Sequence, residues 1–369
     1  MGRALAAVAA ALVVAAPAAA GPPQVRAKAY LVENGATGEV LAGSRANARV
    51  PVASITKLMT VLVALDHAKL DDVVVAPPSA AAVGESTINL RAGERISVHD
   101  LVEAALVQSA NDAAWALAAH VGKGDVNRFV AMMNAKARSI GLHETHFVRP
   151  DGLDAPGHVS SARDVTLLAR VAMRNPTIRS IVDDRNATIS GGRRLHTWND
   201  LLGSFPGLIG VKTGHTAGAG WSQVAAVRSN GFILYATLLG SPTRSQRNTD
   251  LATLLRWGLS RYAAIPVVDG SREYARTDVG FGKQPVALVA PNSLVRSVRV
   301  DRPLRERVVA ATAVDLPVKK GQRLGEVRIF DGARLVASSP LVAARAIEKP
   351  GFFSRASWYA GQALGSIWP

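Results

Sequence analysis

The spacing of apolar residues changes twice along the chain. Residues 27–47 alternate apolar and polar positions around Gly-containing turns, which predicts a β-hairpin. From residue 54 the spacing becomes helical, and residues 54–70 are apolar on nearly all sides, so we expect a central, buried helix there. The same spacing predicts helices over 99–121, with a break at residues 109–111, over 125–141 and over 161–175.

Beyond residue 206 the alternation typical of strands returns. Three strands are predicted, joined by a turn at residues 214–220 and a tight turn at residues 229–231; they cover residues 207–213, 222–228 and 232–240. A helix follows over 251–262. Residues 265–345 are rich in Val and alternate, which predicts a separate small all-β domain. The fold class is therefore α+β, with an antiparallel sheet covered by helices over residues 25–264 and a C-terminal β-rich domain.

The N-terminus has the composition of a targeting segment. A short basic start is followed by an Ala/Val/Leu run, a proline and Ala18-Ala19-Ala20. This pattern is typical of a secretory signal peptide over residues 1–20, and the run is too short to favour a spanning helix, although an uncleaved anchor is the alternative. We therefore expect an exported protein, in the periplasm or at the outer face of the cytoplasmic membrane. The chain has no cysteine, so neither disulfides nor a Cys-linked lipid anchor can hold it.

The C-terminal tail, residues 350–369, is rich in aromatic residues and places apolar residues on one helical stripe. Such a helix suits the interface of the cytoplasmic membrane. The alternative is a helix that docks on the protein's own β domain. The net charge of +15 is scattered along the sequence, which indicates a generally basic surface near an anionic wall or membrane and no nucleic-acid partner.

Candidate chemistry lies in three short motifs, each of which is weak alone. They are Ser54-Ile55-Thr56-Lys57, Ser109-Ala110-Asn111 and Lys212-Thr213-Gly214. The first opens the buried helix, the second lies in the helix–helix break, and the third ends a predicted strand. Together, in this order and in these contexts, they are a specific signal.

The spacing of the first motif suits an activated serine. Residues i and i+3 share a helix face, so the amine of Lys57 can reach the hydroxyl of Ser54. A serine needs a base to take its proton, and burial or a neighbouring cation such as Lys212 lowers the pKa of lysine. The helix N-terminus at Ser54 and the N–H of His215 could form an oxyanion hole.

The other two motifs complete a candidate site for a peptide. Ser109 could pass a proton to the leaving group, and Asn111 could hold a substrate amide. Thr213 and a nearby arginine could bind a substrate carboxylate.

The motifs and their surroundings resemble the superfamily of penicillin-binding proteins and serine β-lactamases, and more closely its low-molecular-mass D-alanyl-D-alanine carboxypeptidases. The resemblance covers residues 25–262 and continues more faintly to the tail; it is carried by PVASITKLMT, SANDAA, MNAKARSIGLHETHF, DGLDAPGHVSSARD and LLGSFPGLIGVKTGHTAGAG. It implies that Ser54 forms an acyl-enzyme, that Lys57 is the general base and that Ser109 assists proton transfer.

The same resemblance implies a substrate-binding strand with Lys212, Thr213, Gly214 and His215. It assigns the arginine that meets the terminal carboxylate to Arg247, with Arg244 as the alternative. The loop over residues 149–161 departs from some relatives, because Asp151 stands where they carry a histidine. We therefore leave open whether Asp151, Asp154 and His158 shape the loop or take part in catalysis.

The function implied is a serine-type D-Ala-D-Ala carboxypeptidase that acts on the peptidoglycan stem peptide and is inhibited by β-lactams. No cofactor or metal is expected, since residues 143–146 lack the i, i+4 histidine pair of a zinc helix. The alternatives are a β-lactamase, a D,D-endopeptidase and a non-catalytic wall-binding module. The loop offers no Glu for a class A β-lactamase, the β domain argues against the endopeptidase, and the intact motifs argue against a dead site.

Overall fold

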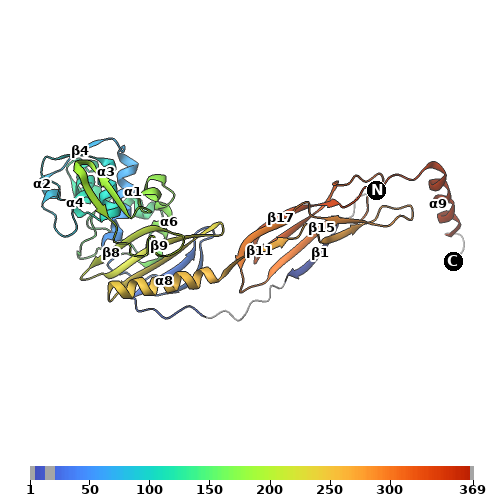
Figure 1. Ribbon diagram of the computed structural model, residues 1–369, viewed down its shortest axis with the longest axis horizontal. Helices are drawn as coiled ribbons and strands as arrows, with labels where there is room; N and C mark the ends of the chain where they lie inside the picture. Colours follow the sequence, from blue (N-terminus) through green and yellow to red (C-terminus); the bar gives the residue numbers. More distant parts are fainter. Residues whose placement is uncertain (1–4, 13–20, 366–369) are drawn as a thin grey trace. The chain divides into compact units, whose positions relative to one another are not determined.

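The computed structural model describes residues 5–12 and 21–365 and divides the chain into two compact units (Figure 1). The larger unit runs from Gly21 to Ser260. The second, here called the β unit, begins at Arg261 and includes the N-terminal strand β1 (Leu5–Leu12). No helix in the described part of the chain is both long and apolar enough to cross a bilayer.

A five-stranded antiparallel sheet forms the centre of the larger unit, in the order β3-β2-β10-β9-β8. Its strands are β2 (Ala29–Asn34), β3 (Glu39–Ser44), β8 (Leu208–Thr216), β9 (Gly220–Ser229) and β10 (Phe232–Ser241). The predicted hairpin and the three predicted strands are confirmed. Helix α8 (Arg244–Ser260) packs so closely on the sheet that a Cβ at Gly258 would come within 2.7 Å of Leu234.

Five other helical elements form the main helical part of the larger unit together with α1 (Lys57–His67), which is buried over most of its length and is preceded by a 3₁₀ turn, η1 (Ala53–Thr56). They are α3 (Val98–Glu103), the π-helical turn η2 (Ala104–Gln108), α4 (Asn111–Val121), α5 (Val126–Ser139) and α6 (Ala162–Ala172). The predicted helices and the break at residues 109–111 are confirmed. Side chains of Ser97, Asp125 and Ser161 cap α3, α5 and α6, which fixes where these helices begin.

Several short elements were not predicted from the sequence. They are α2 (Pro78–Ala81), α7 (Pro176–Ile181), η3 (Ser190–Gly192) and two hairpins, β4 (Val73–Val75) with β5 (Arg95–Ser97) and β6 (Asn186–Ile189) with β7 (Arg193–His196). Each is too short to show a period of its own.

Two predicted boundaries were wrong. Strand β8 continues to Thr216, so Gly214 and His215 lie within the strand instead of the turn, and His215 pairs with Trp221. Helix α8 begins at Arg244 instead of residue 251. Its first two turns are polar, and the residues that they bury are the charged Arg247 and Asp250, which a search for apolar spacing cannot identify.

The β unit has a six-stranded antiparallel sheet and a two-stranded one, β11-β14, around an apolar core. The larger sheet has the order β1-β15-β16-β17-β13-β12. Its other strands are β12 (Glu273–Thr277), β13 (Val286–Val289), β15 (Leu304–Ala311), β16 (Arg323–Asp331) and β17 (Arg334–Ala343); the pair is β11 (Tyr262–Val268) and β14 (Leu294–Arg299).

Strand β1 falls within the predicted signal peptide and pairs with β15. The rest of residues 1–20 lies outside the described residues, and cleavage after residue 20 stays a prediction. The tail forms helix α9 (Phe352–Gly365), and residues 366–369 again lie outside. Trp358 and Tyr359 contact Phe281 of the β unit, with ring centroids 5.1 and 5.9 Å away, whereas Phe352 and Phe353 are 71% and 84% exposed. The tail therefore both docks on the β unit and exposes aromatic rings.

Candidate active site

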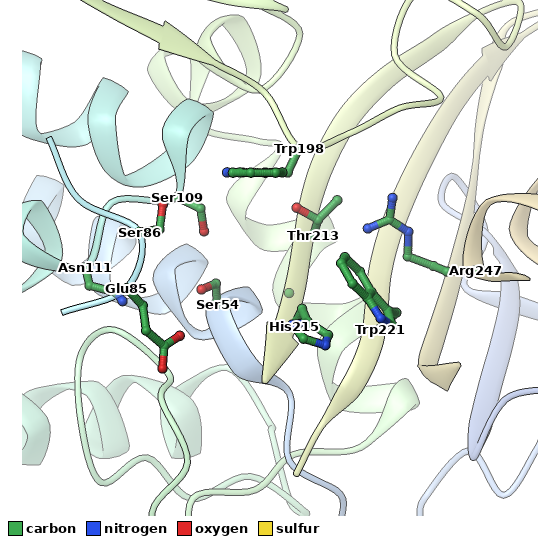
Figure 2. Close-up of a pocket in the computed structure, with 11 residues that line it drawn as sticks. Ser54, Glu85, Ser86, Ser109, Asn111, Trp198, Thr213, His215, Trp221 and Arg247 are labelled. Carbon is green, nitrogen blue, oxygen red and sulfur yellow. The ribbon is translucent and has the colours of Figure 1, made fainter. Parts of the chain in front are cut away.

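The three sequence motifs meet at one pocket of about 200 Å³ between the sheet and the helices (Figure 2). Ser54 lies at its centre. Ser86, Ser109, Asn111 and Glu85 stand on the helical side, Thr213, Gly214, His215, Trp221 and Arg247 on the strand side, and Trp198 closes a third side. Strand β8 brings the third motif to the first, and the break between η2 and α4 brings the second.

The turn that carries Ser54 is held tightly by backbone on two sides. A Cβ at Gly214 would lie 2.8 Å from the carbonyl of Val52 and 3.1 Å from the amide nitrogen of Ser54. A Cβ at Gly152 would lie 2.1 Å from the carbonyl of Ala53, which itself has a φ of 49°. Non-glycine residues with positive φ persist only where surrounding contacts enforce them, so this turn is a pre-formed geometry.

Lys57 is fully buried, and its amine donates hydrogen bonds of 2.7 Å to three oxygens: Ser54 Oγ, Asn111 Oδ1 and the carbonyl of Asp151. Burial lowers its pKa to about 7, against the opposing charges of Asp151, Glu85 and Asp112. The sequence pointed to Lys212 as the neighbouring cation, but the main cause is desolvation, and the cation that adds to it is Arg149. A lysine with this pKa is substantially neutral at pH 7 and can accept the serine proton.

Lys212 and Ser109 form a second buried pair. The amine of Lys212 donates to Ser109 Oγ at 2.8 Å and to the carbonyl of Thr213 at 3.0 Å. Burial first, and then the charges of Lys57 and Arg247, lower the pKa of Lys212 well below its usual value. Ser109 has left-handed backbone angles (φ 65°, ψ 32°) and follows the π-helical turn, a form of helix that is frequent at functional sites.

Asn111 serves first as a partner of Lys57. Its Oδ1 accepts from the lysine, and its Nδ2 donates to the carbonyl of Gly84 at 3.0 Å, so one amide N–H is left to face a substrate. Asp112 accepts from the backbone amides of Ile88 and Leu90 and thereby fixes the loop that carries Glu85 into the pocket.

The loop over residues 149–161 positions the base, and its three candidate residues are held by structural bonds. Asp151 accepts a bidentate pair of hydrogen bonds from Arg149 and one from Trp115 Nε1, and these partners hold its pKa below the usual value even though burial acts to raise it. Asp154 accepts from Thr216 Oγ1 and from the amide of Gly218.

His158 is buried in the same loop. Its Nδ1 accepts from the Val148 amide, so its Nε2 carries the proton and donates to Thr56 Oγ1 at 2.8 Å. Burial lowers the pKa of His158 to about 4, so the ring is neutral. It braces the loop against the turn of Ser54.

Arg247 lies at the far end of the pocket with a side chain only 1% exposed. Its Nη2 donates to Asp200 at 2.9 Å, and burial lowers its pKa to about 10, so it remains a cation. Arg244, the alternative named from the sequence, is more exposed, pairs with the same Asp200 and does not line the pocket. Between the two arginines, the structure brings Arg247 to the site.

Two aromatic walls were missed by sequence reasoning. Trp221 stacks on His215 with ring centroids 3.9 Å apart and also lies 5.8 Å from the guanidinium of Arg247. The guanidinium of Arg244 lies over the ring of Trp198.

Sequence reasoning also missed three charged residues at the site, Glu85, Arg149 and Asp200, because none belongs to a motif. The only sequence signal for any of them was the Pro-Gly-Asp content of the loop beside Arg149, which marks an irregular loop.

One group of side chains in the described residues could hold a metal ion. His99, Asp100 and Glu103 on α3 bring ligand atoms within 4.8 Å of one another. None of the three lines the pocket, and Asp100 already accepts from the Ser190 amide. Residues 143–146, rejected as a metal motif, are bound elsewhere, with Glu144 paired to Arg49 and His146 bonded to a backbone carbonyl.

Comparison with known proteins matches both units. A family model described as D-alanyl-D-alanine carboxypeptidase matches residues 16–243, and one described as penicillin-binding protein 5, C-terminal domain, matches residues 264–349. The chain is 32% identical over 355 residues to the D-alanyl-D-alanine carboxypeptidase DacD of Salmonella typhimurium, a match that covers 92% of this chain and 90% of that protein.

Solved structures of penicillin-binding proteins also resemble this chain. Penicillin-binding protein 5 from Haemophilus influenzae matches with a TM-score of 0.65 and 28% identity, covering 89% of this chain and 100% of that one. Penicillin-binding protein D2 from Listeria monocytogenes, solved in its ampicillin-bound form, matches with a TM-score of 0.58 and 30% identity, covering 63% of this chain and 98% of that one.

Proposed function

The chain belongs to the D-alanyl-D-alanine carboxypeptidase family of serine peptidases, and we propose that Ser54 is the nucleophile with which it removes the terminal D-alanine from peptidoglycan stem peptides. The observation that carries this assignment is the 2.7 Å hydrogen bond between Ser54 Oγ and the amine of a fully buried lysine whose pKa is about 7. This pair is a nucleophile and its base in direct contact.

The reaction runs through an ester. Ser54 Oγ attacks the carbonyl carbon of the last peptide bond, and its proton passes to the neutral amine of Lys57. The new C–O bond gives a tetrahedral oxyanion; the C–N bond then breaks, and the proton held by Lys57 passes through the hydroxyl of Ser109 to the nitrogen of the leaving D-alanine. Water then hydrolyses the ester and restores Ser54. The amide N–H groups of Ser54 and His215 stabilise the oxyanion in both steps.

The substrate enters with its carboxylate toward the far end of the pocket. Arg247 and the hydroxyl of Thr213 bind this carboxylate, and the free amide N–H of Asn111 donates to the peptide. The arginine is supported by Asp200, which keeps its fork oriented toward the pocket. A β-lactam acylates the same serine by opening its ring, which is supported by the ampicillin-bound form of the related Listeria protein.

We also infer that the enzyme is exported and works in the periplasm or at the outer face of the cytoplasmic membrane. The composition of residues 1–20 supports export, and the exposed rings of Phe352 and Phe353 on α9 support attachment of the tail to the membrane interface. N-terminal sequencing of the secreted protein should begin at Gly21. Replacing Phe352 and Phe353 by serine should release the protein from membranes.

Mass spectrometry of the purified protein tests the chemistry. The protein is incubated with a labelled penicillin and, separately, with a peptide that ends in D-Ala-D-Ala. A long-lived adduct on Ser54 together with released D-alanine supports the proposal. Fast loss of the adduct with hydrolysed penicillin and no D-alanine indicates a β-lactamase. Absence of an adduct on Ser54 rules out its assignment as nucleophile.

A further inference from the structure

A second, larger pocket of about 660 Å³ opens in the larger unit, away from Ser54. It lies where α6 and α7 meet the hairpin between β9 and β10. Strand β9 carries Trp221 in the active site and Arg228 in this second pocket, and seven residues of strand span about 23 Å. The two pockets are therefore separate sites at opposite ends of one strand.

Four arginines line this pocket: Arg170, Arg174, Arg179 and Arg228. Arg170 is bonded to the buried carboxylate of Glu33 at 2.7 Å, and Arg179 donates to the carbonyl of Met173. The charge of Asp183 lies near Arg228 without a hydrogen bond between them. Arg174 is exposed and forms no ion pair with any described residue. The pocket thus carries more positive charge than its own carboxylates balance.

The arginines converge on a rigid, largely apolar floor. Tyr235 is only 4% exposed, and its ring lies so close to Gly35 that a Cβ there would come within 2.5 Å of it. Phe232 and Ile233 continue this floor. The charges of Arg170, Arg174 and Arg179 all act on the hydroxyl of Tyr235, although burial still raises its pKa overall.

We propose that this arginine pocket binds an organic phosphate. Guanidinium groups bind phosphate oxygens through paired hydrogen bonds, and several converging arginines favour a group with more than one negative charge. The apolar floor suits the organic part of such a ligand. A soluble phosphate ester and a phospholipid headgroup both carry this chemistry, so the experiment has one arm for each source.

The test uses the purified full-length protein and a variant with R174Q and R228Q. Its matched control carries R95Q and R194Q, two exposed arginines elsewhere in the larger unit with the same loss of charge. Calorimetry measures binding of inorganic pyrophosphate, and flotation measures binding to vesicles of phosphatidylglycerol, with phosphatidylcholine vesicles as the uncharged reference. Melting temperature and penicillin acylation are recorded for each protein.

We expect binding in at least one arm to weaken about tenfold or more in the R174Q/R228Q variant and to change little in the control, because hydrogen bonds to charged groups are lost only in the pocket. Saturable binding of pyrophosphate assigns a soluble ligand, and pocket-dependent flotation without it assigns a headgroup. Acylation should stay unchanged in both variants. No binding in either arm, or an equal loss in the control, overturns the proposal.

Discussion

The larger unit buries cations around its pocket, whereas the β unit holds many of its charges in ion pairs. Lys57, Lys212 and Arg247 are each at most 3% exposed. The β unit also buries two acidic groups, Glu306 and Asp331, but each has an arginine partner. The two lysines instead bond to hydroxyl and carbonyl oxygens, and neither forms an ion pair with a described residue.

The difference separates charge that stabilises a fold from charge that is prepared for a reaction. A buried carboxylate with an arginine partner faces an opposite charge, which favours its charged form. Burial lowers the pKa of a lysine that has no carboxylate partner, at a cost in stability that a purely structural residue would not need.

Replacing Lys57 by methionine should give the largest effect. We expect acylation by penicillin to fall by about 10²–10⁴, because a general base contributes on that order, while the fold stays stable. Stopped-flow kinetics measures the acylation rate, and thermal melting measures the stability of the fold. K136M, which removes a surface lysine paired with Asp66, is the matched control and should acylate normally. An unchanged rate in K57M would remove Lys57 as the base.

The pH dependence follows from the same residue. Acylation should reach half its maximum near pH 7 and fall about tenfold per pH unit below it, since only the neutral amine accepts a proton.

The stability of the fold should depend on pH through the same lysine, because its pKa in the unfolded chain is near 10.5. Between pH 7 and 10.5 the unfolded state binds more protons than the folded state, so the free energy of unfolding rises with pH, by at most about 1.4 kcal/mol per pH unit for this group. The slope should be smaller in K57M; an identical slope would contradict the assigned pKa.

Replacing Arg247 by alanine should lower kcat/KM for the D-Ala-D-Ala peptide by about 10- to 100-fold, the scale of a lost hydrogen bond to a charged group. Steady-state release of D-alanine measures this. Arg244→Ala is the matched control, because Arg244 shares Asp200 but is more exposed and does not line the pocket. Equal losses in both variants would show that Asp200, and not the arginine fork, is what the site needs.

Replacing Asp151 by asparagine should give a smaller, directional effect. Its negative charge raises the pKa of Lys57, and its pairing with Arg149 balances a cation that lowers it. The midpoint of the acylation profile should therefore move to lower pH, with a modest fall in the maximum rate. A midpoint that moves upward would show that the loop had shifted away from the lysine.

The smallest effect is expected in the β unit. Arg328→Ala removes an exposed pair with Glu326, and pairs of this kind contribute little to stability. Acylation and melting temperature should both stay the same within error. A clear loss of acylation would contradict the distinction between the two units, because it would show that a surface charge of the β unit affects the reaction in the larger unit.

Much of the fold and the centre of the site follow from local patterns. The contact between Ser54 and Lys57 depends only on i, i+3 spacing. The strands on either side of residue 230 are predicted by alternating apolar positions and the tight turn between them. Arg149, Trp198 and Asp200 reach the pocket or support it from loops and turns far away in sequence, where no period relates them to the motifs. The start of α8 was missed for a related reason, because the residues that its first two turns bury, Arg247 and Asp250, are charged.

Gly214 has a consequence for the evolution of drug resistance. Any side chain at this position meets the backbone of Val52 and Ser54, which cannot withdraw without moving the nucleophile. A substitution there would reduce recognition of an antibiotic and of the cell's own wall peptide together. Selection by β-lactams should therefore not favour substitutions of Gly214. Substitutions that confer resistance should instead occur at residues of the pocket rim that contact only one of the two ligands.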